Sequence, residues 1–104
     1  MVKIIWTDSA IDDLNDIGEY IAKDSERYAQ ITVEKLFNAV DILLEHPRVG
    51  KIVPEFGNEM LRELVMGNYR IVYHIVEEFR IDIITVHNCA RLIGNAYDFS
   101  GFDE

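Results

Sequence analysis

The clearest pattern of hydrophobic and polar positions lies between Arg62 and Arg91, where three short apolar runs are separated by two turns. The middle run, Tyr69–Val76, alternates with the two-residue period of a pleated strand. Gly67-Asn68 before it tolerates positive φ, and the short segment after it leaves room only for a tight reversal. The pattern predicts a three-stranded antiparallel meander. One face of the middle strand would carry Tyr69, Ile71, Tyr73 and Ile75, and the other Arg70, Val72, His74 and Val76.

The first half of the chain has the period of amphipathic helices instead. A short β-prone run, Lys3–Trp6, is followed by apolar residues at spacings of three and four from Ala10 to Ile21. Thr7 or Asp8 is suited to cap the helix that this spacing predicts. Acidic residues cluster toward its N-terminal end, where the helix dipole favours them.

A second amphipathic helix is predicted from about Glu26 to Glu45, with Asp24 or Ser25 as its cap. It ends before Pro47, because the residue preceding a proline is pushed out of the α region. The connection between the two helices is short. We therefore expect them to lie antiparallel as a hairpin.

The segment Arg48–Met60 contains two glycines and a proline and has no sustained period, which predicts an ordered surface loop. Loops of about a dozen residues are more often functional than short connectors are. The predicted elements follow the order β-α-α-β-β-β. This order indicates a single α+β domain, residues 1–104, in which an antiparallel sheet packs against a two-helix hairpin.

The size of the chain is sufficient for one modest core. Folding 104 residues hides about 65% of the unfolded surface, so neither a metal nor a disulfide is needed. Cys89 is the only cysteine, so no internal disulfide can form, as suits a reducing compartment. No apolar run has the length of a signal peptide core or of a membrane span. We expect a cytoplasmic protein with no membrane partner.

The formal net charge is −9, and the acidic residues are unevenly distributed. Residues 1–46 carry ten acidic and four basic residues, whereas residues 47–91 carry six of each. Nucleic-acid binding draws most of its affinity from neutralised phosphates, so an acidic chain is a poor non-specific binder. We expect no direct binding to free nucleic acid, since only the sheet could gather enough cations.

Residues that bind metals or act as nucleophiles are present but scattered. His46, His74 and His87 fall in different predicted elements with no pair at ligand spacing, so we expect no metal site and no cofactor. No Gly-rich phosphate loop and no Gly-x-Ser-x-Gly elbow occurs. Cys89 assisted by His87 is a conceivable nucleophile, but a lone cysteine is more often a small buried hydrophobe.

The arginines are more informative, because most of them fall on or beside the predicted strands. We expect Arg70 and Arg80 to pair across the strands with acidic residues, namely Glu63, Glu78 or Asp82. Arg62 and Arg91 lie at two positions where a groove between loop, sheet and tail would gather positive charge. These two arginines are therefore the candidates for contact with a partner.

Several short motifs follow one another in a specific order: W-T-x-x-A-x-x-D-L-x-x-I-x-x-Y-I at Trp6–Ile21, the turn His46-Pro47-x-x-Gly50, R-E-L at Arg62–Leu64, Y-R-I-V-Y at Tyr69–Tyr73 and V-H-N-x-A-R at Val86–Arg91. Together they span most of the chain and resemble the RelE/ParE toxin superfamily of bacterial and archaeal toxin-antitoxin systems, known also from plasmid stabilisation. The details look more like the ParE side. The resemblance implies the β-α-α-β-β-β fold and neutralisation by a cognate antitoxin whose C-terminal segment wraps the toxin.

Members of this superfamily divide by activity. The RelE-like branch cleaves mRNA on the ribosome, a reaction that needs cations on the phosphate and groups that move protons. The resemblance would place these catalytic groups at Lys51, Arg62, Arg91 and Tyr97. Cys89, however, stands where the ribonucleases tend to carry a basic residue, and losing one such cation costs about 10²- to 10³-fold in rate.

The ParE-like branch is instead associated with binding DNA gyrase, which requires a protein-binding surface rather than a catalytic set. We therefore favour a ParE-like toxin that binds a protein target such as gyrase and inhibits growth without being an enzyme. The alternatives are a RelE-like ribosome-dependent mRNA endonuclease and a degenerate toxin that only binds its antitoxin. An acidic chain suits a toxin that binds a protein target best, since such a toxin does not have to bind phosphates.

The antitoxin is expected to contact the less acidic half of the chain. Antitoxin segments of this kind typically fold on binding, as a helix in a groove or a strand on a sheet edge. We expect the contacts on the sheet face, on the Arg48–Met60 loop and on the tail. The predicted antitoxin-binding residues are Arg62, Arg70, Arg91, Tyr97 and Phe99.

Overall fold

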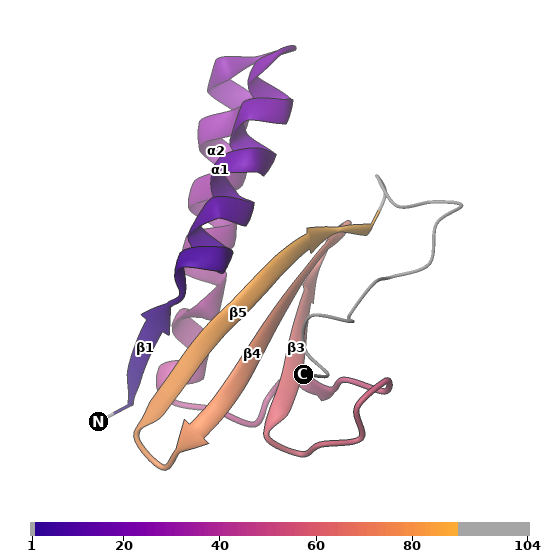
Figure 1. Ribbon diagram of the computed structural model, residues 1–104. Helices are drawn as coiled ribbons and strands as arrows, with labels where there is room; N and C mark the ends of the chain where they lie inside the picture. Colours follow the sequence, from indigo (N-terminus) through magenta and orange to yellow (C-terminus); the bar gives the residue numbers. More distant parts are fainter. Residues whose placement is uncertain (1, 90–104) are drawn as a thin grey trace.

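The computed structural model describes residues 2–89, which form two layers (Figure 1). One layer is an antiparallel pair of helices, α1 (Asp8–Ala22) and α2 (Glu26–Ala39), and the other is a β-sheet. α1 contacts both α2 and the last strand of the sheet. The predicted helical hairpin packed on a sheet is therefore confirmed. Within residues 2–89 no helix is both long and apolar enough to cross a membrane.

The described sheet has five strands in the order β1-β5-β4-β3-β2. The predicted meander is formed by β3 (Leu61–Met66), β4 (Tyr69–Glu77) and β5 (Arg80–Asn88), which pair antiparallel. β1 (Lys3–Trp6) lies parallel to β5, and the two-residue β2 (Lys51–Ile52) lies antiparallel to β3. The sheet is thus mixed rather than purely antiparallel, because the period of a strand does not specify its distant neighbour or its direction.

Both helices begin where the sequence predicts a cap. The Thr7 side chain accepts a hydrogen bond from the Ala10 backbone N–H (3.2 Å). The Ser25 side chain accepts one from the Tyr28 backbone N–H (3.1 Å). These bonds satisfy donors that have no partner within the first turn of a helix.

The helical run predicted to reach Glu45 changes its geometry on the way. α2 ends at Ala39, and Val40–Leu44 form a 3-10 helix, η1. Residues three apart in a 3-10 helix lie on the same side, which here places Val40 and Leu43 in the core together. The predicted extent of the helical run is confirmed, while its end is a 3-10 helix rather than an α-helix.

The main core lies between the helices and one side of the sheet, which we call the helix face. As predicted, Ile71, Tyr73 and Ile75 of β4 point toward this core. The core therefore joins the two layers into one unit. Its buried side chains are Ala10, Leu14, Ile17, Leu36, Val40, Leu43, Ile71, Tyr73, Ile75, Ile81, Ile83 and Val86.

The other side of the sheet, the outer face, has a small core of its own. Val53 and Val72 are fully buried there, and Phe56, Leu61 and Ile84 pack against them. The chain that follows β2 therefore crosses the outer face. The predicted surface loop has a second role as a cover for part of the sheet.

Candidate functional site

The hydroxyl of Tyr73 holds the turn that follows η1. It donates a hydrogen bond to the Pro47 carbonyl (2.7 Å) and accepts one from the Gly50 backbone N–H (3.0 Å). Its ring is fully buried in the main core. Burial raises the pKa of Tyr73, so the hydroxyl keeps the proton that it donates. One side chain thus ties the loop to the centre of the sheet.

Gly50 has no room for a side chain. A Cβ atom at this position would lie 2.6 Å from the Glu63 carbonyl oxygen and 2.6 Å from the Tyr73 hydroxyl. Both neighbours belong to the sheet, so neither can move aside cheaply. The close approach of the loop to β3 and β4 explains why the turn His46-Pro47-x-x-Gly50 requires glycine at its last position.

Arg62 holds the same loop from the next strand. Its Nε donates to the Glu59 carbonyl (2.8 Å), and its Nη1 donates to the carbonyls of Arg48 (3.1 Å) and Gly50 (2.9 Å). Three of the donors of this guanidinium group are therefore directed at the backbone of the chain itself. The sequence suggests Arg62 as a contact to a partner. In the structure, Arg62 holds the parts of the loop that lie before and after β2.

Lys51 and Arg62 lie on opposite faces of the sheet. In the register of β2 and β3, Lys51 is opposite Glu63 and Ile52 is opposite Arg62. Directly opposite residues share a face, and successive residues alternate between faces. Lys51 is exposed on the outer face, whereas Arg62 is half-buried on the helix face, opposite Tyr73. Two of the four residues proposed for the nuclease are thus separated by the sheet.

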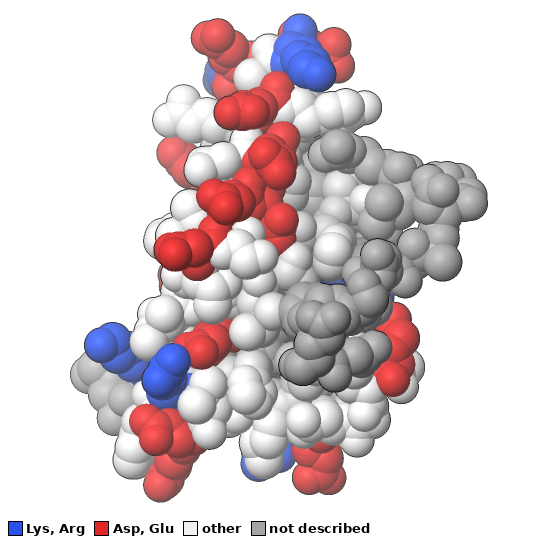
Figure 2. All heavy atoms as spheres, viewed as in Figure 1, with Lys and Arg blue, Asp and Glu red and all other residues white. Residues whose placement is uncertain are grey.

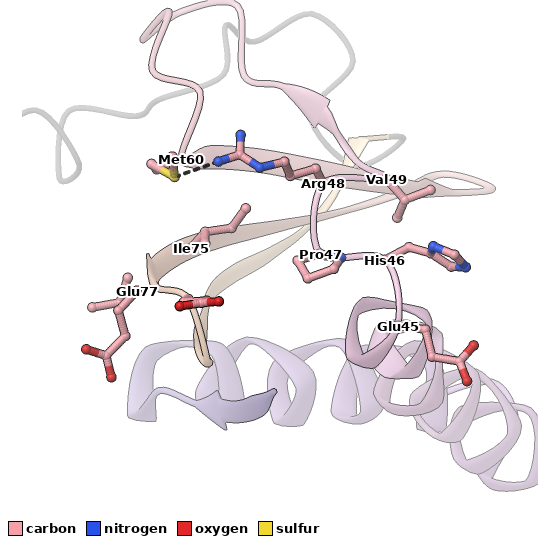
Figure 3. Close-up of a pocket in the computed structure, with 10 residues that line it drawn as sticks. Glu45, His46, Pro47, Arg48, Val49, Met60, Ile75 and Glu77 are labelled. Carbon is pink, nitrogen blue, oxygen red and sulfur yellow. Dashed lines mark hydrogen bonds between the residues drawn. The ribbon is translucent and has the colours of Figure 1, made fainter. Parts of the chain in front are cut away.

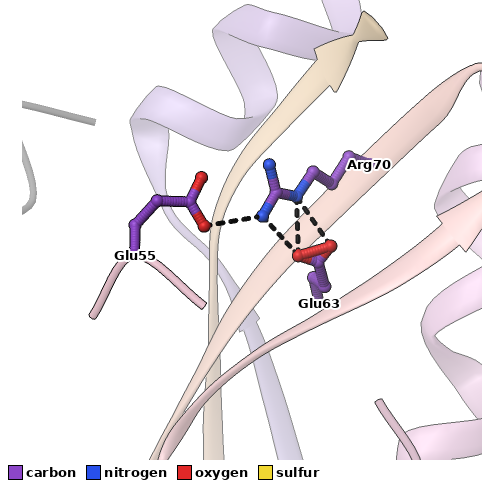
Figure 4. Close-up of polar contacts among 3 residues, drawn as sticks. All are labelled: Glu55, Glu63 and Arg70. Atoms are coloured by element: carbon purple, nitrogen blue, oxygen red, sulfur yellow. Dashed lines mark hydrogen bonds and ion pairs between the residues drawn. The ribbon is translucent and has the colours of Figure 1, made fainter. Parts of the chain in front are cut away.

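Arg70 lies in a buried ionic cluster on the outer face (Figure 4). Its Nε donates to the Glu63 carboxylate (2.7 Å), and its Nη2 lies 3.3 Å from a Glu55 oxygen. Burial opposes the charge of Arg70, but the bonds and charges of Glu63 and Glu55 outweigh it and raise its pKa. The predicted pair with Glu63 is confirmed, while a role of Arg70 in binding an antitoxin stays a prediction.

Arg80 forms the second predicted pair, in a different setting. Its Nε lies 3.0 Å from an Asp82 oxygen, and the hydrogen bond and charge of Asp82 raise the pKa of Arg80. The two residues are neighbours along β5 rather than across two strands. Asp82 is confirmed as the partner, while the predicted geometry across two strands is wrong for this pair. The pair lies at the surface, where such pairs contribute little to stability.

Asp13 of α1 completes the edge of β5. β1 pairs with β5 only as far as Ile83. Beyond that point the Asp13 carboxylate accepts hydrogen bonds from the Val86 backbone N–H (3.0 Å) and from the Thr85 hydroxyl. This contact is not predicted by the sequence. The available signal was the position of Asp13 on the apolar stripe of α1, three residues after Ala10.

His87 lies next to this polar junction. Its Nε2 is 3.4 Å from the Thr85 hydroxyl oxygen. Burial lowers the pKa of His87, the nearby charge of Arg70 lowers it further, and the negative charge of Asp13 opposes both effects. The imidazole is therefore mainly neutral at neutral pH. Among the described residues, no three His, Cys, Asp or Glu side chains gather where they could hold a metal ion.

The remaining predicted site residues, Arg91, Tyr97 and Phe99, lie outside the described residues. Their predicted grouping with Arg62 and Arg70 stays a prediction. The groove predicted between loop, sheet and tail stays a prediction for the same reason.

A hollow of about 860 Å³ lies at one end of the sheet, where the turn between β4 and β5 faces the chain after η1 (Figure 3). The sequence analysis did not predict it, because its walls come from segments that are far apart in the chain. Its lining residues are Glu45, His46, Pro47, Arg48, Val49, Met60, Ile75, Val76, Glu77 and Glu78.

The helical layer presents a strongly acidic side. Asp8, Asp12, Asp16 and Glu19 are exposed and recur at spacings of three and four, so they lie on one side of α1. Figure 2 shows acidic side chains in a column along the helical layer. α1 contains no basic residue. This side of the molecule therefore repels phosphate groups, as the charge distribution in the sequence indicates.

The comparisons with known proteins agree with the fold. The family model of the ParE toxin of the type II toxin-antitoxin system parDE matches residues 4–93. Toxin RelE2 of Caulobacter vibrioides is 32% identical over 92 residues, which cover 88% of this chain and 100% of that protein.

Two solved structures share the fold at lower identity. A chain of the chromosomal ParDE toxin-antitoxin system of P. aeruginosa superposes with a TM-score of 0.70 at 21% identity, covering 85% of this chain and 96% of that one. A chain of the toxin-antitoxin complex RelBE2 of Mycobacterium tuberculosis superposes with a TM-score of 0.53 at 24% identity, covering 84% and 96%. The resemblance drawn from the sequence motifs is confirmed, and the chain belongs to the ParE toxin family of type II toxin-antitoxin systems.

Proposed function

We propose that this toxin acts by binding a protein target, DNA gyrase, and that a cognate antitoxin neutralises it by direct binding. Such a mechanism requires a docking surface and no catalytic residues. It places the toxin in the cytoplasm, together with its target. The family assignment supports a toxin of a type II pair, and the geometry of the sheet favours binding over RNA cleavage.

The separation of Lys51 and Arg62 carries this proposal. Cleavage of an RNA phosphate requires cations and proton-transfer groups that converge on one phosphate. Lys51 and Arg62 lie on opposite faces of the sheet, and three donors of Arg62 already bind backbone carbonyls. A phosphate held by both residues would require the loop to be rebuilt. The −9 charge of the chain further disfavours contact with ribosomal RNA and mRNA.

Purified gyrase provides the direct test. Adding the toxin to gyrase and relaxed plasmid should block supercoiling or trap cleaved DNA, and toxin already mixed with its antitoxin should have no effect. Lys51→Ala is the matched variant and should inhibit gyrase as strongly as the wild type. Unchanged supercoiling together with shortened mRNA in a translation extract would contradict the proposal.

The second candidate is a ribosome-dependent mRNA endonuclease, and the 32% identity to a toxin named RelE2 favours it. In that case Lys51→Ala, Arg91→Ala and Tyr97→Phe should each reduce mRNA cleavage and relieve growth arrest. Full arrest by all three variants would exclude this candidate. If expression of the wild-type chain causes no arrest, the third possibility, a degenerate toxin that only binds its antitoxin, gains instead.

A further inference from the structure

The hollow at the end of the sheet has an apolar floor that is open to water. Pro47, Met60 and Ile75 contribute to it, and the side chains of Val49 and Val76 remain 50% and 40% exposed. A hollow of about 860 Å³ falls within the range of about 300–1,000 Å³ that is usual for ligand sites. Apolar surface left exposed in a concave site of this size is typical of an interaction surface.

Charged residues border this floor, and they are mostly acidic. Glu45 follows η1 and Glu77 ends β4 (Figure 3). Glu78 is the next residue along the chain. The side chains of Glu45 and Glu78 make no hydrogen bond or ion pair with another described residue. Arg48 is the one arginine among the lining residues, and its Nη2 contacts the Met60 sulfur (3.9 Å). The border therefore favours a cationic partner.

We propose that this hollow is a docking site for a segment of the antitoxin in which an apolar side chain is flanked by lysine or arginine. The apolar side chain would cover Val49, Val76 and Ile75, and the flanking cations would lie beside Glu45, Glu77 and Glu78. The inference rests on that part of the proposed function in which an antitoxin neutralises the toxin. Beyond that function, the inference specifies where on the toxin the antitoxin segment binds and which types of side chain the segment carries.

The charge of the whole toxin points to the same kind of occupant. A chain of net charge −9 attracts a basic partner at long range, and the carboxylates of Glu45 and Glu78, which pair with no other described residue, provide contacts for its cations. A segment that folds on binding can follow a hollow whose walls come from the turn after η1, the end of β4 and the two ends of the Arg48–Met60 loop. This loop is also where the sequence analysis expects antitoxin contacts.

The test measures binding between the purified toxin and the purified protein encoded by the adjacent reading frame. Reversing two border charges with Glu77→Lys and Glu78→Lys together should weaken the affinity about 10-fold at 0.1 M salt and flatten its salt dependence. Val76→Arg should weaken it by at least about 10-fold, because it replaces apolar contact with a like charge. Circular dichroism and the urea midpoint verify that both variants are folded.

The matched control is Asp16→Lys with Glu19→Lys, which changes the net charge by the same amount on the exposed side of α1. At 0.1 M salt, charges farther apart than about 10 Å are largely screened, so we expect a loss below about threefold. Equal losses in both double variants would overturn the proposal, since total charge would then explain them. Unchanged affinity in both hollow variants would also overturn it.

Two further outcomes separate this inference from the proposed mechanism. If the hollow variants bind the antitoxin normally but no longer inhibit gyrase, the hollow belongs to the target, and the proposal is wrong. If the wild-type toxin does not bind the adjacent protein, both the docking site and the antitoxin part of the proposed function fail. Because the binding measurement contains no gyrase, a negative gyrase assay leaves the antitoxin result intact.

Discussion

Tyr73 has two roles at the scale of a single residue. Its ring fills the centre of the core, and its hydroxyl satisfies two backbone groups of the turn that follows η1. Burial of a polar group is costly unless its bonds are made, so ring and hydroxyl are both required at this position. The strand pattern predicts the ring, but nothing in the local sequence indicates the partner of the hydroxyl.

Removal of this hydroxyl should loosen the loop without disturbing the core. Tyr73→Phe leaves the Gly50 N–H buried without an acceptor, and we expect it to lower the free energy of unfolding by about 1–3 kcal/mol. Urea denaturation measures this loss. Tyr28→Phe, at a 60% exposed tyrosine, is the control and should change nothing. An unaltered urea midpoint for Tyr73→Phe would show that the loop does not depend on this bond.

The ionic cluster of Arg70 gives a second prediction at the residue scale. The side chains of Arg70 and Glu63 are only 10% and 9% exposed, so removing one leaves the other charged and buried. Glu63→Ala should therefore cost about 3 kcal/mol in unfolding free energy, with Glu55 as the remaining partner of Arg70. The double variant Glu63→Leu with Arg70→Met should regain most of this loss.

The exposed pair of β5 serves as the control for this experiment. Arg80→Ala removes a side chain that is 45% exposed, and we expect no measurable change in the urea midpoint. If Arg80→Ala lowers the free energy of unfolding as much as Glu63→Ala does, burial does not decide how much these ion pairs contribute to stability.

At the scale of elements, α1 does more than cover the sheet. β1 is too short to accompany β5 along its length, so the backbone N–H of Val86 has no strand partner on that side. Asp13 supplies the acceptor from the helix, and Thr85 adds a second bond to the same carboxylate. The helix thus takes the place of a missing strand at the edge of the sheet.

This contact can be tested with neighbouring carboxylates. Asp13→Ala should lower the free energy of unfolding by about 1–3 kcal/mol, because it leaves a buried backbone donor unsatisfied. Hydrogen exchange of the Val86 amide should become faster in the same variant. Asp12→Ala removes an exposed carboxylate one residue away and should leave both measurements unchanged. Slow exchange at Val86 in Asp13→Ala would contradict the assigned role.

At the scale of the whole molecule, His87 couples stability to pH. Its pKa is lowered by folding, so between its folded pKa and its ordinary value of about 6.5 the unfolded chain binds more protons. This contribution to stability is present at neutral pH and is lost as the pH falls through the ordinary value toward the folded one. Asp13 and Arg70 are the charges that act on it in the folded state.

His87→Gln should therefore flatten the dependence of unfolding free energy on pH between about 7.5 and 5.5. The measurement is a set of urea titrations across this range, compared with the wild type at each pH. If His87→Gln shows the same slope of unfolding free energy against pH as the wild type, the pH dependence comes from other groups.

The sequence by itself determined the two helices, β1 and the three strands of the meander, which side of β4 enters the core, and the family of the chain. These features follow from local periodicity, caps and turns, which depend on residues near one another. The sequence did not predict β2, which lies inside the expected loop. It predicted that Arg70 and Arg80 pair with acidic residues of the strands, although only the Arg70 pair joins two strands and the Arg80 pair lies along β5. The caps at Thr7 and Ser25 were predicted from the same local rules.

Only the tertiary structure decided what depends on contacts between distant segments. The parallel pairing of β1 with β5, the bond from Asp13 to Val86 and the hollow all join residues widely separated in the chain. Local periodicity carries no information about such neighbours. For the same reason Lys51 and Arg62 looked like members of one site in the sequence, while the register of β2 and β3 places them on opposite faces.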